Sequence, residues 1–213
     1  MDVIEKLSEI FKEFPGIGER QAKRFVYFLM SKNSAYAENL SMSLSDLKKE
    51  VAQCRECFRF FIIKSKENKN QVCDICLNVH TDSSVLMVIE KDSDLESVKK
   101  SRVYNGKYFI LGGLVPIVEK STKKRIRIEE LKKKIESEAR PNALGLASLK
   151  EVILAFSLSP QGDHTDSYVR EQIKDIAEKF DIKVSSLGRG LSTGTELEYS
   201  DNDTLKNALK NRR

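Results

Sequence analysis

Residues 54–76 read CRECFRFFIIKSKENKNQVCDIC, and this stretch holds all four cysteines of the 213-residue chain. The cysteines form two C-x2-C pairs, Cys54 with Cys57 and Cys73 with Cys76. Two such pairs can fold against each other and place four thiolates at the corners of a tetrahedron, as zinc requires in closed structural sites. The spacing therefore predicts one structural zinc ion per chain, with no open position for a catalytic water.

Other uses of these cysteines fit the pattern less well. Unrelated buried thiols would not be expected to fall into two pairs, and a redox C-x-x-C needs only one pair beside a βαβ unit. His80 follows the last cysteine closely and is an alternative metal ligand. An ordinary exposed side chain is the simpler interpretation of that histidine.

The composition is that of a soluble globular protein, with 40% hydrophobic and 32% charged residues. The first residues, MDVIEKLSEIFKEF, contain no apolar run with a cleavage site, so no signal peptide is expected. No apolar stretch approaches the roughly 20 residues of a membrane helix. We therefore expect a cytoplasmic protein without membrane contact, whose reduced thiols are free to bind metal.

A pair of helices precedes the cysteines. Apolar spacing predicts helices over residues 2–13 and 19–30, interrupted by FPGIG at residues 14–18. A glycine-rich turn at a helix start exposes backbone N–H groups, and the positive end of the helix dipole favours a phosphate there. This pattern resembles the helix-hairpin-helix motif, which grips the DNA backbone without reading sequence.

The residues expected to contact DNA lie in this turn and in the helix that follows it. Glu19 works against phosphate binding, so Arg20 and Arg24 are the stronger candidates, and a plain structural turn is the alternative. The full set comprises Gly16, Gly18, Arg20, Lys23 and Arg24.

The remainder of the chain alternates between strands and helices. A helix is predicted over residues 43–52, with Ser45 or Asp46 as its cap. Short apolar runs then predict strands at 85–89, 108–111, 152–156 and 182–184, with helices after the first strand and at 129–139, 166–180 and 203–211. Such alternation implies a mainly parallel sheet with right-handed crossovers.

Acidic residues follow the first of these strands. Glu90 ends it, and Asp94 comes four residues later. This resembles the first acidic element of the Toprim fold, which occurs in topoisomerases, primases and some nucleases. Those enzymes hold Mg²⁺ between such a Glu and an Asp-x-Asp after a later strand, because Mg²⁺ needs clustered carboxylate oxygens.

The second acidic element is degenerate. The Asp-x-Asp positions hold Ser157 and Ser159, Gln161 replaces the acid before Gly162, and only Asp163 remains. Neutral oxygens at these positions predict no tight Mg²⁺ binding and no catalysis from this site.

The order of these parts resembles the RecR family of bacterial recombination mediators over essentially the whole chain. Beyond FPGIG, the shared motifs are YFILGG at 108–113, EVILA at 151–155, GRGL at 188–191 and GTELEY at 194–199. The cysteine pairs lie farther apart than is usual in the family, and Ser157-Leu158-Ser159 replaces Asn-Pro-Thr.

The resemblance implies a DNA-binding protein that has no enzymatic activity. It implies ring-shaped homo-oligomers, often tetramers, that can encircle DNA and act with RecO and RecF to load RecA at gaps. The positions of Arg20 and Arg24 match family residues implicated in DNA binding. The Toprim acids Glu90, Asp94 and Asp163 are expected to face RecO.

Basic residues are concentrated in one segment. Residues 99–134 contain twelve Lys or Arg against three acids, although the whole chain carries a net charge of only +5. A concentrated basic segment can attract a polyanion by releasing its counterions. The alternative is a solvated helix face with a lysine-rich loop.

These observations predict a multidomain α+β protein. The expected parts are a helix-hairpin-helix region (1–53), a zinc-binding region (54–79), an α/β Toprim domain (80–185) and a helical C-terminal segment (186–213) used in oligomer contacts. A recombination mediator is the preferred function. The alternatives are a Mg²⁺-dependent Toprim nuclease or primase-like enzyme, and a zinc-ribbon interaction module with no nucleic-acid role.

Overall fold

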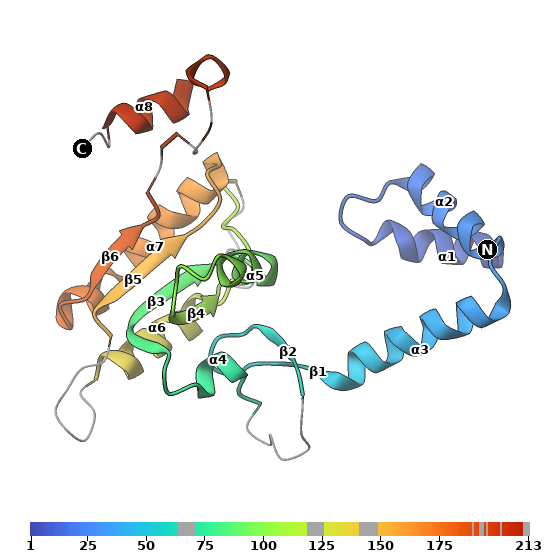
Figure 1. Ribbon diagram of the computed structural model, residues 1–213, viewed down its shortest axis with the longest axis horizontal. Helices are drawn as coiled ribbons and strands as arrows, with labels where there is room; N and C mark the ends of the chain where they lie inside the picture. The colour runs from blue at the N-terminus through green and yellow to red at the C-terminus, as the bar shows by residue number, and fades with distance from the viewer. Residues whose placement is uncertain are drawn as a thin grey trace. The chain divides into compact units, whose positions relative to one another are not determined.

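The computed structural model describes residues 1–63, 71–118, 126–140, 149–188, 190–191, 194, 196–200 and 202–210. The chain divides into two compact units, Met1–Ala52 and Gln53–Arg213, and each is described by itself (Figure 1). Across the described ranges, no helix is long and apolar enough to cross a membrane. The basic residues at 120 and 123–125 lie outside the described residues.

The first unit contains three helices, α1 (Val3–Lys12), α2 (Glu19–Met30) and α3 (Ser34–Glu50), and its last two residues begin a short strand. A capping box begins α1, where the Asp2 carboxylate accepts from the backbone of Glu5 at 2.7 Å. The rings of Phe11 and Phe25 pack edge to face at 5.6 Å and hold α1 against α2. The two predicted helices and the break between them are confirmed.

Helix α3 is longer than the sequence pattern predicted. It begins after Asn33, whose side chain accepts from the backbone of Tyr36 at 3.0 Å, and not at Ser45 or Asp46. None of its seventeen residues is buried. Because α3 has no buried face, a search for a buried apolar stripe did not detect the first half of the helix. The helix begins where the Asn33 side chain caps it.

The second unit is built on a parallel sheet with the strand order β4-β3-β5-β6. Its strands are β3 (Asp82–Ile89), β4 (Gly106–Ile110), β5 (Glu151–Ala155) and β6 (Lys183–Ser186). Its long helices are α5 (Asp92–Ser101), α6 (Ile128–Ala139) and α7 (Pro160–Lys179). The predicted strands and helices are confirmed with shifted ends, which are the least certain part of a periodicity argument.

Alternating side chains of the central strands fill two separate cores. Leu86 and Val88 of β3 face α6 and α7, and pack with residues such as Leu131 and Ile173. Met87 and Ile89 point to the other face, where Leu95 of α5 covers them. Both faces are therefore covered, which explains why β3 reads as a continuous apolar run.

The remaining elements are small. The cysteine region contributes β1 (Val51–Gln53), β2 (Phe60–Ile62) and the one-turn helix α4 (Asp74–Leu77), and β1 pairs with β2. The C-terminal segment contains a 3-10 turn (Leu197–Tyr199) and α8 (Asn202–Lys210).

Candidate metal centre and nucleic-acid interface

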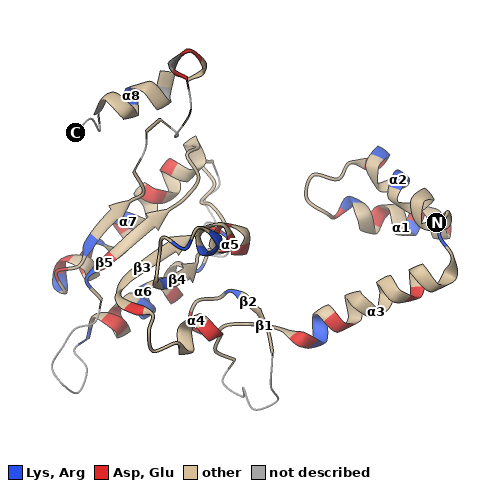
Figure 2. Ribbon diagram, viewed as in Figure 1, with Lys and Arg blue, Asp and Glu red and all other residues tan. Residues whose placement is uncertain are grey.

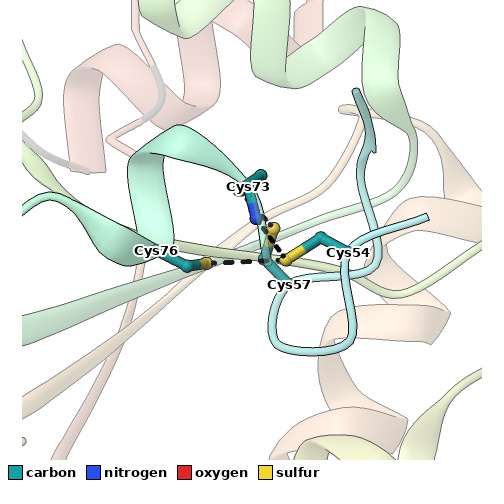
Figure 3. Close-up of side chains that lie close together, drawn as sticks. All are labelled: Cys54, Cys57, Cys73 and Cys76. Carbon is teal, nitrogen blue, oxygen red and sulfur yellow. Dashed lines mark hydrogen bonds between the residues drawn. The ribbon is translucent and has the colours of Figure 1, made fainter. Parts of the chain in front are cut away.

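The four cysteines come from two short loops. In the first, the backbone N–H of Phe58 donates to the carbonyl of Cys54 at 3.0 Å, and Phe58 takes a positive φ of 62°. The second begins α4, whose cap is Cys73. Figure 3 shows Cys73 and Cys76 entering from α4 and the other two from the opposing loop. Each C-x2-C pair therefore forms one tight turn that points its sulfurs toward the other pair.

The sulfur geometry fits a tetrahedral ion. All four Sγ atoms lie within 4.8 Å of one another, with Cys57–Cys73 at 3.6 Å and Cys54–Cys76 at 3.9 Å. A tetrahedron with metal–sulfur bonds of about 2.3 Å needs sulfur separations of about 3.8 Å. The structure thus brings together the four predicted ligands as a zinc-type site.

Hydrogen bonds among the four thiols shift their pKa values in opposite directions, raising those of Cys57 and Cys76 and lowering that of Cys73. Hydrogen bonds from the thiols of Cys57, Cys73 and Cys76 hold the pKa of Cys54 well below its usual range. A thiol that ionises readily is a good ligand, because only the thiolate binds metal. His80 is exposed and is not a member of the four-sulfur group.

Backbone and ring contacts dock the cysteine module onto the edge strand β4. The N–H of Ile110 donates to the carbonyl of Cys57 at 2.9 Å. The ring of Phe58 packs edge to face on Phe109 at 5.3 Å, and the Arg127 guanidinium lies over Phe58 at 5.2 Å. The module therefore covers an edge that would otherwise present unpaired groups.

Buried charges complete the docking. Lys134 of α6 is 6% exposed and pairs with Glu138 at 3.0 Å and with Glu56, between the first two cysteines, at 3.2 Å. Lys107 also reaches Glu138, at 2.9 Å. Burial alone would lower the pKa of Lys134, but the carboxylates of Glu138 and Glu56 raise it above its ordinary value. The lysine therefore stays charged in this interface.

The predicted DNA contacts lie together at the start of α2. Arg20, Lys23 and Arg24 are all exposed and share one face of the helix, since they are three and four residues apart. Figure 2 marks these basic positions along α2. Lys23 pairs with Glu19 at 2.8 Å, which leaves the two arginines as the stronger candidates, as the sequence indicated.

The turn before α2 has the backbone form of an anion site. Gly16 takes a φ of 79°, which glycine adopts without strain. Gly18 is the N-cap of α2 and provides no side-chain acceptor. The first N–H groups of α2 therefore remain available to a phosphate oxygen.

The predicted Toprim residues lie at the carboxyl edge of the sheet. Glu90 follows β3, and Ser157 follows the neighbouring strand β5. Glu90, Asp94 and Asp163 do not assemble as a metal-binding group; of the described residues, only the four cysteines do so. The hydroxyls of Ser157 and Ser159 contact each other at 3.0 Å, and Ser159 caps α7. The serines therefore serve the local fold.

Asp92 is a connecting residue that the sequence pattern did not predict. Its carboxylate accepts from the backbone N–H of Phe60 in β2 at 2.8 Å. The Toprim resemblance rests on the nearby acids Glu90 and Asp94 and assigns no role to Asp92. A contact between residues 32 positions apart leaves no local signal in the sequence.

The structure divides the basic segment into two groups. Lys107 and Lys134 form ion pairs at the module interface, Arg127 stacks on Phe58, and Lys132 donates to Gln172 at 2.8 Å. The exposed basic residues in the described part of this segment are Lys133 on α6 and, at the end of α5, Lys99, Lys100 and Arg102. Part of the charge excess is therefore structural, and part faces solvent.

A helix-hairpin-helix unit, a four-cysteine module and a Toprim-type sheet together define a modular protein of DNA repair and recombination. Family comparison matches residues 4–48 to the RecR helix-hairpin-helix, 84–187 to the Toprim domain and 190–213 to the RecR C-terminal region. The chain belongs to the RecR family. This confirms the family membership that the sequence motifs predicted.

Individual relatives match along nearly their whole length, and each is named recombination protein RecR. The one from Amoebophilus asiaticus is 31% identical over 210 residues, which cover 99% of this chain and 95% of the relative. The one from Ureaplasma urealyticum is 32% identical over 98% of this chain and 94% of the relative. The one from Chloroherpeton thalassium is 33% identical, with 98% and 95% covered.

Proposed function

We propose that the protein is a non-enzymatic mediator that binds DNA without sequence preference and helps to load RecA at gaps, acting with RecO and RecF. Family membership supports this role. The single observation that carries the DNA contact is the start of α2, where uncapped backbone N–H groups lie beside Arg20 and Arg24.

The chemistry of this contact explains its lack of sequence preference. A DNA phosphate would accept from the N–H groups of α2, and the two arginines would add charge-assisted hydrogen bonds. Such contacts position a protein on the backbone and carry no base information. The protein is proposed to act in the cytoplasm as a ring-shaped homo-oligomer, with a tetramer as the expected size.

The metal in this proposal is one zinc ion held by Cys54, Cys57, Cys73 and Cys76. Zinc would supply structural cross-linking and no chemistry, because four protein ligands leave no open position. Its role is to hold both cysteine loops so that Cys57 and Phe58 stay on β4. The proposed zinc-binding region, 54–79, is thus a scaffold for the proposed Toprim domain, 80–185.

The carboxyl edge of the sheet is proposed as a partner surface. Asp163 is exposed, and Glu90 is partly exposed, so both are accessible to RecO. Serines at 157 and 159 favour binding over Mg²⁺-dependent strand cleavage. The C-terminal segment, 186–213, is proposed to serve oligomer contacts.

The experiment measures binding to gapped DNA at rising salt. We expect affinity to fall steeply with salt, and Arg20→Ala with Arg24→Ala to weaken binding about tenfold or more without loss of fold. A matched control, Arg140→Ala with Lys174→Ala, removes two exposed cations from the second unit and should change affinity little. Undiminished affinity in the first double variant would reject the hairpin contact. Mg²⁺-dependent cleavage or synthesis on DNA would favour the enzyme alternative.

A further inference from the structure

A cavity of about 430 Å³ lies in the second unit, between the cysteine module and the amino-terminal end of the sheet. Its lining includes Asn78 beyond α4, Lys99 of α5 and Asn105 just before β4. Glu90 lies at the opposite, carboxyl end of the parallel strands. The cavity is therefore separate from the proposed partner surface.

The floor of the cavity is rigid. Tyr104 and Tyr108 both line it, and their rings pack edge to face at 5.1 Å. The Tyr104 hydroxyl donates to the backbone carbonyls of Lys107 at 2.8 Å and Val85 at 3.1 Å. Gly106 permits this packing, because a Cβ there would overlap the Tyr104 hydroxyl. Tyr108 is 3% exposed, so the partly exposed ring of Tyr104 provides most of the aromatic surface that a ligand can reach, and its hydrogen bonds hold it in place.

Two amide side chains on the wall are fixed through the same residue. Asn78 uses its Oδ1 to accept from the backbone N–H of His80 at 3.0 Å. Asn105 uses its Nδ2 to donate to the carbonyl of His80, also at 3.0 Å. These bonds leave the NH₂ of Asn78 and the carbonyl oxygen of Asn105 to serve a ligand. The wall therefore offers one donor and one acceptor in fixed orientations.

The charge at this site favours an anion. Lys99 lines the cavity and has no ion-pair partner within the described chain. Asp74 also lines the cavity, but Arg59 lies 3.3 Å from its carboxylate and compensates the charge. Lys100 and Arg102 are exposed on the same end of α5. Figure 2 shows this group of basic positions at α5.

We propose that this cavity binds one nucleotide unit of single-stranded DNA, with Lys99 on the phosphate and Asn78 and Asn105 on the edge of the base. A base offers both donors and acceptors on its edge, and its flat face suits an aromatic floor. The volume falls within the range of small-molecule pockets. The choice of a nucleotide as ligand rests on the proposed DNA-binding function. The proposal assigns a function, binding of a phosphate, to Lys99 in the exposed part of the basic segment.

The test uses the full chain carrying Arg20→Ala and Arg24→Ala, so that the contribution of the hairpin to binding is reduced and is the same in every variant compared. Lys99→Gln and Lys100→Gln are compared in this background, because they remove the same charge from adjacent exposed positions and only Lys99 lines the cavity. We expect Lys99→Gln to weaken binding of a short adenine oligonucleotide about three- to tenfold, and Lys100→Gln less than about twofold. Equal effects of the two changes would overturn the proposal.

A second measurement distinguishes a base from a phosphate. Nitrogen-labelled protein is titrated with dAMP and, separately, with inorganic phosphate. The side-chain amide signals of Asn78 and Asn105 should shift with dAMP and remain unchanged with phosphate. Shifts with both ligands, or with neither, would contradict base recognition. None of these results tests DNA binding by the hairpin, which is tested separately by the Arg20→Ala and Arg24→Ala variant.

Discussion

The backbone N–H of Phe60 donates to the carboxylate of Asp92 at 2.8 Å, which joins strand β2 of the cysteine module to the first residue of α5. Two residues before Asp92, the carbonyl of Glu90 accepts from the N–H of Gly112 at 2.9 Å. The acidic turn is therefore held from both sides, by the module and by the loop after β4. The module positions the proposed partner surface as well as the edge strand.

Replacing Asp92 should loosen this turn. Asp92→Ala removes the acceptor for Phe60, so we expect a loss of about 1–2 kcal/mol in the free energy of unfolding, measured by urea denaturation. Asp92→Asn keeps an oxygen acceptor and should lose less. Asp94→Ala is the matched control, because that carboxylate accepts only a long 3.4 Å bond from Ser93 within the described chain. Equal losses in Asp92→Ala and Asp94→Ala would contradict the assigned role.

Removing a cysteine should unfold the module. Cys57→Ser breaks both the sulfur cluster and the loop that docks on Ile110, and metal binding in such modules is coupled to folding. We expect zinc content to fall well below one per chain and the melting temperature to drop. His80→Ala should keep both values, since that ring lies outside the cluster. Retained zinc in Cys57→Ser would contradict the four-thiolate site.

Lys134 should be costly to remove. Lys134→Ala removes the cation that Glu138 and Glu56 share, while Lys107 still compensates Glu138. We therefore expect a loss somewhat below the ~3–5 kcal/mol that a buried charge left without any partner costs. Lys133→Ala, at an exposed neighbouring position, should cost little. Thermal unfolding of both variants would measure the difference, and similar melting temperatures would argue against a buried charge network.

The same lysine predicts a pH dependence. Its folded pKa is raised, so its stabilisation is fully present below the unfolded pKa of about 10.4 and is lost as pH rises through the folded value. The stability difference between the wild type and Lys134→Met should therefore be constant near neutral pH and change only in strongly alkaline solution. A change between pH 6 and 8, on the order of 1 kcal/mol, would contradict this assignment.

Gly162 has no room for a side chain. A Cβ at this position would overlap the backbone oxygen of Ser157, so α7 could not approach the end of β5. We expect Gly162→Ala to destabilise the protein by about 2 kcal/mol or more. Gly188→Ala is the control, because nothing lies within 4 Å of the point that a Cβ would occupy there. Comparable stability of the two variants would contradict this steric requirement.

Elements that follow from a regular local spacing of residues could be predicted from the sequence. Contacts between residues far apart in the chain could not. The apolar run of β3 and the spacing of the cysteines each follow from a local rule, so the sheet and the zinc-type site were foreseen. The Phe60–Asp92 and Glu56–Lys134 contacts join segments far apart in the chain. Nothing in either local sequence identifies the other partner.

The basic segment shows why charge counting is an incomplete guide. Lys107 and Lys134 added to the positive excess, yet both are paired with Glu138. Only the fold separates these cations from Lys99, which faces a cavity. Net charge therefore predicted an attraction for polyanions without identifying which side chains provide it.

The absence of burial along α3 bears on how the protein unfolds. Helix α3 buries no side chain and contacts α2 through exposed residues such as Tyr36, whose ring lies 6.1 Å from that of Phe28. It therefore gains little tertiary stabilisation, and an isolated helix of this length is marginal in water. The helical unit and the sheet unit are therefore expected to melt as separate cooperative blocks. A single free energy of unfolding would not describe this chain. The unfolding of each variant should therefore be measured with a spectroscopic probe located in the unit that carries the substitution.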